Sequence, residues 1–394
     1  MLASCAIAGN LVHGATFAQS IALSAAVEAA WERSVPAASA QGQLALAAAQ
    51  RQAADSFWAA PPSLELSHRS DRLQDNAGRS ESEVGVAWPL ILPGQRSARQ
   101  AAASAERDVA EAALAAARLR IAGEVREAAW MVVARRAEAS VAAQNAQSLQ
   151  ALAADVERRV GAGDLARADT LAARAEFLSA SALAAEARQR LDAATAQWKV
   201  LTGLQNVPDP AESGFGPGGT HPELTLASLG VEAARAKLDL VRTSRSDPPE
   251  LAVRYRHEAP ASGLPAEKTV GLAIRIPLGT GDRNSPREKA ALAELEVARA
   301  EERRQRLRLE SETATARAAL AIAEELLGAE QARAGLLGER AALIERSFRA
   351  GETPLPELLR ASAAATQAQA ALAAQRAAAG LARARLNQIN GQLP

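Results

Sequence analysis

The chain has very few of the side chains that build metal and catalytic sites. It contains 1 Cys, 2 Met and 4 His in 394 residues. The lone Cys5 excludes a disulfide within the chain and a cysteine-rich metal site. The histidines show no metal-ligand spacing; they are His13, His68, His221 and His257. Because we also find no nucleophile paired with a base and no phosphate-binding loop, the sequence predicts no enzyme, no metal site and no cofactor.

Aromatic residues and net charge are scarce as well. Aromatics make up 3% of the chain, and 45 basic residues balance 45 acidic ones. A compact core of this size normally uses more Phe, Tyr and Trp, so we expect an elongated shape in which helices pack through alanine side chains. A chain without net positive charge gives no support for nucleic-acid binding.

No apolar run long enough for a transmembrane helix follows the N-terminus. Residues 1–18 are small and apolar and end in Ala-Thr-Phe-Ala before Gln19, as at the cleavage site of a secretory signal peptide. The basic residues that normally open such a peptide are missing, so we expect a signal truncated at its start. Two alternatives are a lipid anchor at Cys5, which ends a lipoprotein-like box, and a buried N-terminal segment.

Proline is absent from two long stretches, 94–207 and 287–353. Each stretch contains a pattern typical of a long helix that ends in a glycine turn, and a return helix follows that turn. The predicted helices are 97–160, 166–203, 285–349 and 355–391. A coiled-coil spacing recurs in the second stretch at Ala316, Leu320, Ala323 and Leu327. Each half of the chain is therefore expected to form an antiparallel helical hairpin with a tip at its glycines.

Between the helices lie short segments in which apolar residues alternate with polar or very small ones. This period of two predicts strands at 62–69, 83–90, 249–256 and 269–277. Such strands suit either a membrane barrel, with lipid outside and water inside, or a half-buried sheet in a soluble domain. Phe57, Trp58 and Trp88 near the strand ends fit an aromatic belt at a lipid interface or an ordinary core.

The chain repeats itself after about 188 residues. The segment from Glu157 to Leu171 matches that from Glu345 to Leu359 in its Glu, Ala, Gly, acidic and Leu positions. We expect a first repeat at 19–203, a linker rich in proline and glycine at 204–221, and a second repeat at 222–394, each repeat opening with a helix before its strands. Because the smallest closed barrels need about eight strands, four from one chain must be completed by other chains.

This order of elements, present twice, resembles the TolC-like outer-membrane efflux protein family. The most specific matches are the tip patterns that join Gly163 to Asp169 and Gly351 to Glu357, and the closing segment 386–391. The resemblance implies a mainly α fold with a small membrane β-barrel. It implies a homotrimer that pools twelve strands into that barrel and its coiled-coil hairpins into a periplasmic α-barrel.

The resemblance also implies a function, that of a passive conduit in the outer membrane of a Gram-negative bacterium. Its partners would be outer-membrane lipid, a periplasmic adaptor (membrane fusion protein) and an inner-membrane pump of the resistance-nodulation-division (RND) type. Segment 276–284 is similar to outer-membrane partners of cobalt, zinc and cadmium pumps, so we expect divalent heavy-metal cations as cargo. The alternatives are export of drugs, type I protein secretion, or a periplasmic coiled-coil scaffold or adaptor that never enters the bilayer.

Asp169 and Glu357 are the candidate gate residues. In the family, acids at this position point into the narrow periplasmic end of the tunnel and favour cations. The alternative is that each carboxylate caps the return helix whose first turn it occupies. The second acidic position of the family pattern is Ala172 in the first repeat and Arg360 in the second, which departs from that pattern.

The candidate docking surface for the adaptor lies at the two tips. Its residues are Val160, Gly161, Gly163, Phe348, Arg349 and Gly351. A plain glycine turn between antiparallel helices explains the same residues and is compatible with docking.

Overall fold

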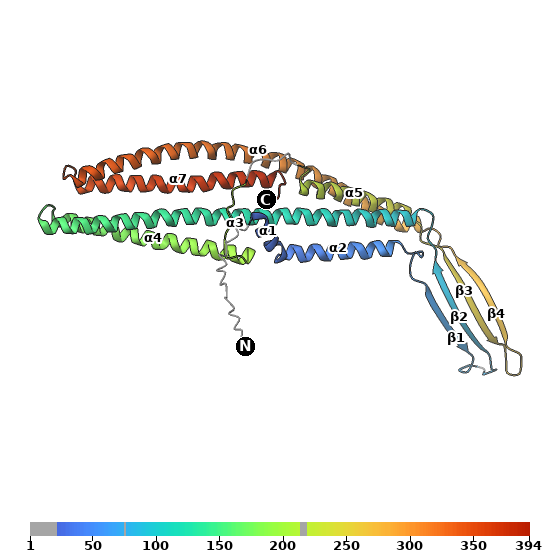
Figure 1. The fold of residues 1–394 in the computed structure, drawn as a ribbon. Coiled ribbons are helices and arrows are strands. Elements are labelled where there is room, and N and C mark those ends of the chain that lie inside the picture. Colours follow the sequence, from blue (N-terminus) through green and yellow to red (C-terminus); the bar gives the residue numbers. More distant parts are fainter. Residues whose placement is uncertain (1–21, 75, 213–218) are drawn as a thin grey trace, which may run out of the picture.

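The computed structural model describes residues 22–74, 76–212 and 219–394. Within them, a four-stranded sheet stands at one end, and long helices run away from it to two hairpin tips at the other end (Figure 1). The expected signal peptide, 1–18, and the candidate lipid site at Cys5 lie outside the described residues.

The first half of the chain opens with α1 (Leu23–Glu32) and α2 (Val35–Ala54), where the sequence predicts one helix. The break falls at Ser34, whose hydroxyl caps α2 by accepting a hydrogen bond from the Ala37 N–H at 3.2 Å. Pro36 then occupies the first turn of α2, where a missing N–H does no harm. The elements that follow are β1 (Ser63–Ser70), β2 (Ser80–Pro89), α3 (Gln95–Ala162) and α4 (Arg167–Thr202).

The second half repeats this order. Its elements are α5 (Pro222–Thr243), β3 (Glu250–Ala259), β4 (Glu267–Arg275), α6 (Thr280–Arg349) and α7 (Leu355–Ile389). α6 begins before the predicted residue 285 and includes Pro286. Its extra turn is held by Asn284, whose Nδ2 donates to the Arg245 carbonyl at 2.9 Å and to the Asp247 carboxylate at 3.0 Å.

The sheet has the order β1-β2-β3-β4, and every neighbouring pair is antiparallel. The two central strands extend further from the helices than predicted. β2 begins at Ser80 and not at 83, β3 ends at Ala259 and not at 256, and Ser80 pairs with both Ser70 and Ala259. These strand ends are polar, so the apolar alternation that predicts the strands does not detect them.

The long helices pack through small side chains. α3 has 68 residues, which corresponds to a length of about 100 Å at about 1.5 Å per residue. On α4, buried alanines recur every seventh residue, the period of a coiled coil, at Ala173, Ala180, Ala187 and Ala194. On α6 the predicted seam is confirmed, because Leu320 and Ala323 are buried while Ala316 and Leu327 are half-buried.

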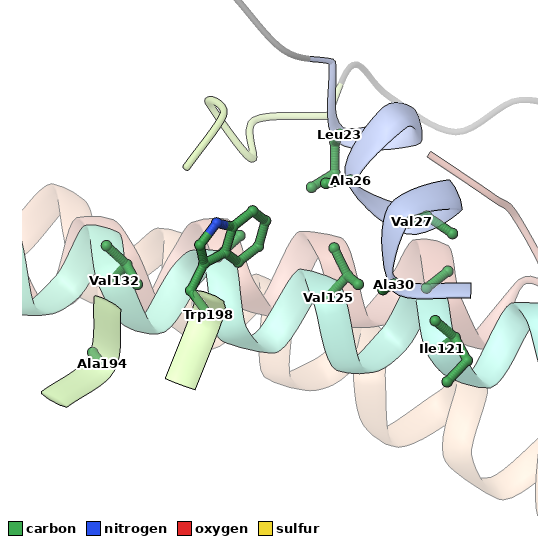
Figure 2. Close-up of a cluster of buried hydrophobic side chains, with 11 residues drawn as sticks. Leu23, Ala26, Val27, Ala30, Ile121, Val125, Val132, Ala194 and Trp198 are labelled. Atoms are coloured by element: carbon green, nitrogen blue, oxygen red, sulfur yellow. The ribbon is translucent and has the colours of Figure 1, made fainter. Parts of the chain in front are cut away.

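One apolar cluster of larger side chains joins α1, α3 and α4 (Figure 2). Trp198 of α4 is fully buried there, between Val125 and Val132 of α3. Leu23 and Val27 of α1 cover the same cluster. The short helix α1 is thereby fixed across the middle of the hairpin, where α4 ends and α2 begins.

Candidate functional site

The first tip is the turn between α3 and α4. Gly163 follows α3 with a φ of 89°, a left-handed conformation that glycine adopts without a Cβ clash. Its N–H donates to the Val160 carbonyl at 3.1 Å, and the Asp164 N–H donates to the Arg159 carbonyl at 2.9 Å. These two bonds form a Schellman motif, which satisfies carbonyls that the end of the helix would otherwise leave unpaired.

The second tip, between α6 and α7, has the same geometry. Gly351 has a φ of 81°. Its N–H donates to the Phe348 carbonyl at 3.0 Å, and the Glu352 N–H donates to the Ser347 carbonyl at 3.0 Å. The duplication seen in the sequence therefore extends to the individual hydrogen bonds of the two tips.

The two tips pack against each other through an apolar cluster. Its buried members are Val156, Ala173, Phe348, Leu355 and Leu358. Arg159 of α3 reinforces the contact, because its guanidinium lies 5.2 Å from the centre of the Phe348 ring and its Nη1 donates to the Phe348 carbonyl at 3.3 Å. The tips of both hairpins thus form one continuous surface.

Most of the predicted docking residues lie on this surface. Gly161, Gly163, Arg349 and Gly351 are exposed, and Val160 is half-buried. Phe348 differs from the expectation, because its side chain is only 3% exposed and lies between the hairpins. It joins the tips together and does not present its ring to a partner, since a large aromatic gains more by burial against α3 than by exposure.

Asp169 caps the helix in whose first turn it lies. Its carboxylate accepts a hydrogen bond from the Ala166 N–H at 3.1 Å, just ahead of the first residue of α4. This is the capping contact considered as the alternative to a gate. Capping uses one carboxylate oxygen and leaves the charge in place, so it is compatible with a role at a tunnel mouth.

Glu357 has a different environment from Asp169. Its carboxylate contacts Arg340 of α6 at 3.2 Å and Arg360 of α7 at 3.5 Å, and its side chain is 33% exposed. Arg360 stands where a second acid was expected from the resemblance, and its positive charge lies beside Glu357. Among the described residues, no hydrogen bond or ion pair joins Glu357 to Asp169.

At the opposite end of the molecule, one face of the sheet is apolar and open to the surroundings. Its side chains form rows across the strands, such as Leu64, Val86, Val253 and Leu272. Leu66, Val270 and Leu272 are exposed by 70%, 75% and 75%. At this face the aromatic rings of Trp58 and Trp88 lie 6.4 Å apart near the helix end of the strands.

The other face of the sheet is charged. Arg254 of β3 reaches Glu83 at 3.5 Å and Glu65 at 3.6 Å, and Arg256 contacts Glu81 at 2.8 Å. The two edge strands, β1 and β4, each pair on one side only. In the part of the chain that the structure describes, an apolar face and two sheet edges therefore have no partners.

A polar cluster is buried midway along the helices, and the sequence analysis did not detect it. Arg126 of α3 is 2% exposed and pairs with Glu212, and its Nη1 donates to Gln388 of α7 at 2.6 Å. Gln388 in turn donates to the Leu119 carbonyl at 2.7 Å. Gly123 makes room for it, because a Cβ there would lie 3.0 Å from the Gln388 amide carbon. The position of Gly123 within a long helix was the one available signal.

Within the described part of the chain, no three His, Cys, Asp or Glu side chains are grouped as a metal ion would require. Of the helices in residues 22–74, 76–212 and 219–394, none is both long and apolar enough to span a bilayer.

The family model for outer membrane efflux proteins matches residues 27–204 and 219–392. The chain belongs to the outer membrane efflux protein family. Members of this family are channels and not enzymes. The two matched segments each contain one of the glycine tips and two of the strands described above.

A curated relative in this family is the cobalt-zinc-cadmium resistance protein CzcC of Cupriavidus metallidurans. It is 29% identical over 253 residues, a match that covers 61% of this chain and 59% of CzcC. The chain therefore matches somewhat more than half of the length of this relative.

Solved structures of other proteins share the fold over nearly the whole chain. CusC gives a TM-score of 0.77 at 17% identity, covering 94% of this chain and 92% of its own. VceC, an outer membrane protein of Vibrio cholerae, gives a TM-score of 0.74 at 18% identity. That match covers 94% of this chain and 96% of VceC. The mainly helical architecture with a small antiparallel sheet is thus the one expected from the sequence.

Proposed function

We propose that the protein is the outer-membrane channel of a tripartite efflux system, assembled as a homotrimer. The observation that carries this proposal is the sheet, which leaves an apolar face and two edges without partners. Unpaired edges of this length promote association, and burial of the apolar face requires a surrounding of low polarity. Three chains that pair β4 of one with β1 of the next would close a barrel of twelve strands, with lipid against the apolar face.

The strand lengths support a membrane position. The four strands have 8, 10, 10 and 9 residues. A tilted strand needs about 9 to 11 residues to cross a bilayer. Phe57, Trp58 and Trp88 would then form part of an aromatic belt at the periplasmic interface, where the helices begin.

The helices provide a second seam for the trimer. Towards the tips, α3 packs on α4 and on α7, and α7 packs on α6, so α4 and α6 are the outermost helices of one chain. Both expose apolar residues away from these contacts: Leu171, Leu178, Leu183, Ile322, Leu326, Leu336 and Leu343. We place α4 of one protomer against α6 of the next, which buries both sets and closes a helical tunnel.

The tips are the docking surface for a periplasmic adaptor, which in turn joins the channel to an inner-membrane RND pump. The exposed glycines allow the close approach of a partner helix, because a Cβ at Gly161, Gly163 or Gly351 would meet nothing within 4 Å among the described residues. Val160 and Arg349 border this surface. Phe348 contributes by packing between the two tips and joining them.

Divalent heavy-metal cations are the proposed cargo. The support is the similarity to CzcC, a cobalt-zinc-cadmium resistance protein by name, together with the segment 276–284. Export of drugs, type I protein secretion and a periplasmic scaffold remain the competing functions. Deletion of the gene should sensitise the host to zinc, cobalt or cadmium more than to lipophilic drugs. If the deletion strain loses drug resistance and keeps its metal tolerance, the protein is instead a channel for drugs.

Asp169 and Glu357 are proposed to lie at the periplasmic mouth, where three copies of each would attract cations. Asp169→Asn separates this role from capping, because Asn keeps an acceptor for the Ala166 N–H and removes the charge. We expect it to lower the cation selectivity of the reconstituted channel at nearly unchanged stability. Asp169→Ala should lower both, with a stability loss of about 0.3 to 1 kcal/mol for the acidic side chain in the first turn of α4. Unchanged selectivity in the Asn variant would reduce Asp169 to a helix cap.

Subcellular fractionation tests the location directly. The proposal requires the protein to sediment with the outer membrane and to be released only by detergent. Recovery from the soluble periplasm without detergent would favour the scaffold or adaptor.

A further inference from the structure

The charged face of the sheet is organised in rows that run across all four strands. One row is Glu65, Gly85, Arg254 and Gly271, and the next is Ser67, Glu83, Arg256 and Thr269. Nearer the helices, a row of very small residues follows: Ser63, Ala87, Ala252 and Ala273. The row of small, neutral side chains and the first row that contains Arg254 are therefore direct neighbours on this face.

Arg254 does not project straight from the sheet. Its aliphatic chain crosses Gly85, because a Cβ at that position would lie 3.2 Å from Arg254 Cγ. Beyond Gly85 its guanidinium reaches Glu65 of β1 at 3.6 Å, and its Nε lies 3.5 Å from Glu83 of β2. The absence of a side chain at Gly85 is what allows one arginine to contact acids on two strands.

On the other side of Arg254, Gly271 leaves the surface open. A Cβ at Gly271 would meet no atom within 4 Å. Arg256, in the next row, contacts Glu81 at 2.8 Å and Glu258 at 3.2 Å. The carboxylates thus hold both arginine side chains close to the surface of the sheet. The neighbours of Arg254 in its row, Gly85 and Gly271, have no side chain.

Acidic residues exceed basic ones on this face. The residues that share the face of Arg254 by the strand register include the glutamates Glu65, Glu81, Glu83, Glu250, Glu258 and Glu267 and the arginines Arg69, Arg254, Arg256 and Arg275. The arginines that form ion pairs on this face are neutralised by their carboxylate partners. Because glutamates outnumber arginines, each chain keeps a net negative charge on this face.

We propose that this face is a cation-selective band of the pore wall, in which Arg254, bent flat over Gly85 by Glu65 and Glu83, sets how strongly cations are preferred. The proposal rests on the proposed channel function, since the charged face lines water only if three sheets close a barrel. In the closed barrel the band would hold three copies of every acid and arginine. It would favour divalent cations over anions through the field of its excess carboxylates.

The test uses the full-length trimer, purified in detergent and reconstituted in a planar bilayer. Reversal potentials in a KCl gradient at low ionic strength give the ratio of potassium to chloride permeability. Arg254→Gln removes one positive charge per chain and should raise this ratio by roughly twofold, a modest effect because water around the half-exposed guanidinium weakens its field. Glu83→Gln, nearly the same size as Glu83, should lower the ratio instead.

A matched control removes a positive charge from the other face of the same sheet. Lys268 shares the face of Val270 and Leu272, so Lys268→Gln should change the ratio much less than Arg254→Gln. Opposite shifts for Arg254→Gln and Glu83→Gln support the band. Equal ratios in the wild type and Glu83→Gln overturn it, even if Arg254→Gln fails to assemble. A protein that forms no conducting channel at all would overturn the proposed function, which is a separate result.

Discussion

The guanidinium of Arg126 and the carboxylate of Glu212 form a buried, two-pronged ion pair, with Nε to oxygen at 2.6 Å and Nη2 to oxygen at 3.1 Å. Arg126 belongs to α3 of the first repeat and Glu212 to the linker between repeats. Asn387 of α7 donates to the same carboxylate at 2.6 Å. The pair therefore ties the linker to a helix from each half of the chain.

Loss of one partner of this pair should be strongly destabilising. Glu212→Ala would leave the charge of Arg126 buried without compensation, and we expect a loss of about 3 to 5 kcal/mol, as for other broken buried pairs. Thermal melting of the purified protein measures the loss. As a control, Glu232→Ala removes an exposed partner of Arg235 on α5 and should change stability by about 0 to 1 kcal/mol. Equal melting temperatures for both variants would contradict a structural role of the linker.

Replacement of Gly380 in α7 by alanine should destabilise the protein, although a glycine-to-alanine change normally stabilises a helix. Ala is favoured over Gly inside a helix by about 1 kcal/mol. A Cβ at Gly380 would, however, overlap the indole ring of Trp130 of α3. We expect Gly380→Ala to lower the melting temperature, because the ring must leave its place between the two hairpins.

The matched control is Gly335 of α6, where a Cβ would meet nothing within 4 Å. Gly335→Ala should raise the melting temperature. A rise of the same size in Gly380→Ala would show that Trp130 moves aside freely and that the α3 to α7 contact is loose.

Replacement of Gly351 by valine should separate docking from assembly. A β-branched residue is strained at a φ of 81°, so the second tip would have to change its shape. The trimer should still form, while site-specific cross-linking to the adaptor and metal resistance should be lost. Gly42→Ala, at a helical position of α2 with open space and away from the tips, should keep both functions. Normal cross-linking in Gly351→Val would remove this tip from the docking surface.

His221 predicts a pH dependence. Burial lowers its pKa below the usual 6.5, against the opposing effects of Glu223, the Gln388 backbone and Glu312. The neutral ring caps α5, since Nδ1 accepts a hydrogen bond from the Glu223 N–H at 3.1 Å. The folded state therefore binds a proton less readily than the unfolded state. The contribution of His221 to the free energy of unfolding is fully present above the pKa of the unfolded state, about 6.5. It is lost as the pH falls from there through the lower pKa of the folded state.

Melting temperatures between pH 8 and pH 5 test this dependence. His221→Asn keeps an acceptor for the cap and removes the titrating group, so its melting temperature should fall less on acidification than that of the wild type. Identical pH profiles for the two proteins would assign the acid sensitivity to other groups.

The sequence was informative where a local pattern determines the structure. The glycine tips follow from helix periodicity interrupted by Gly163 and Gly351, and the strands follow from apolar alternation. The duplication then placed equivalent tips and strands in both halves. The tip and strand signals depend on neighbours within a few residues, and the structure agrees with them.

What the sequence left unseen depends on contacts between distant segments. The burial of Phe348 requires Arg159 and Val156 of the other hairpin, about 190 residues away in the chain. The early start of α6 depends on Asp247, and the buried charge of Arg126 depends on Glu212. Hydrophobic periodicity does not report such pairs, because each partner alone has the pattern of an ordinary surface residue.

The native mass of the detergent-extracted protein tests the central claim most directly, because a closed barrel requires three chains. One chain has a mass of 41.0 kDa. Light scattering corrected for bound detergent should give close to three times that value for protein extracted from the outer membrane. A monodisperse single-chain mass, obtained from the same membranes or from the soluble periplasm, would contradict the account.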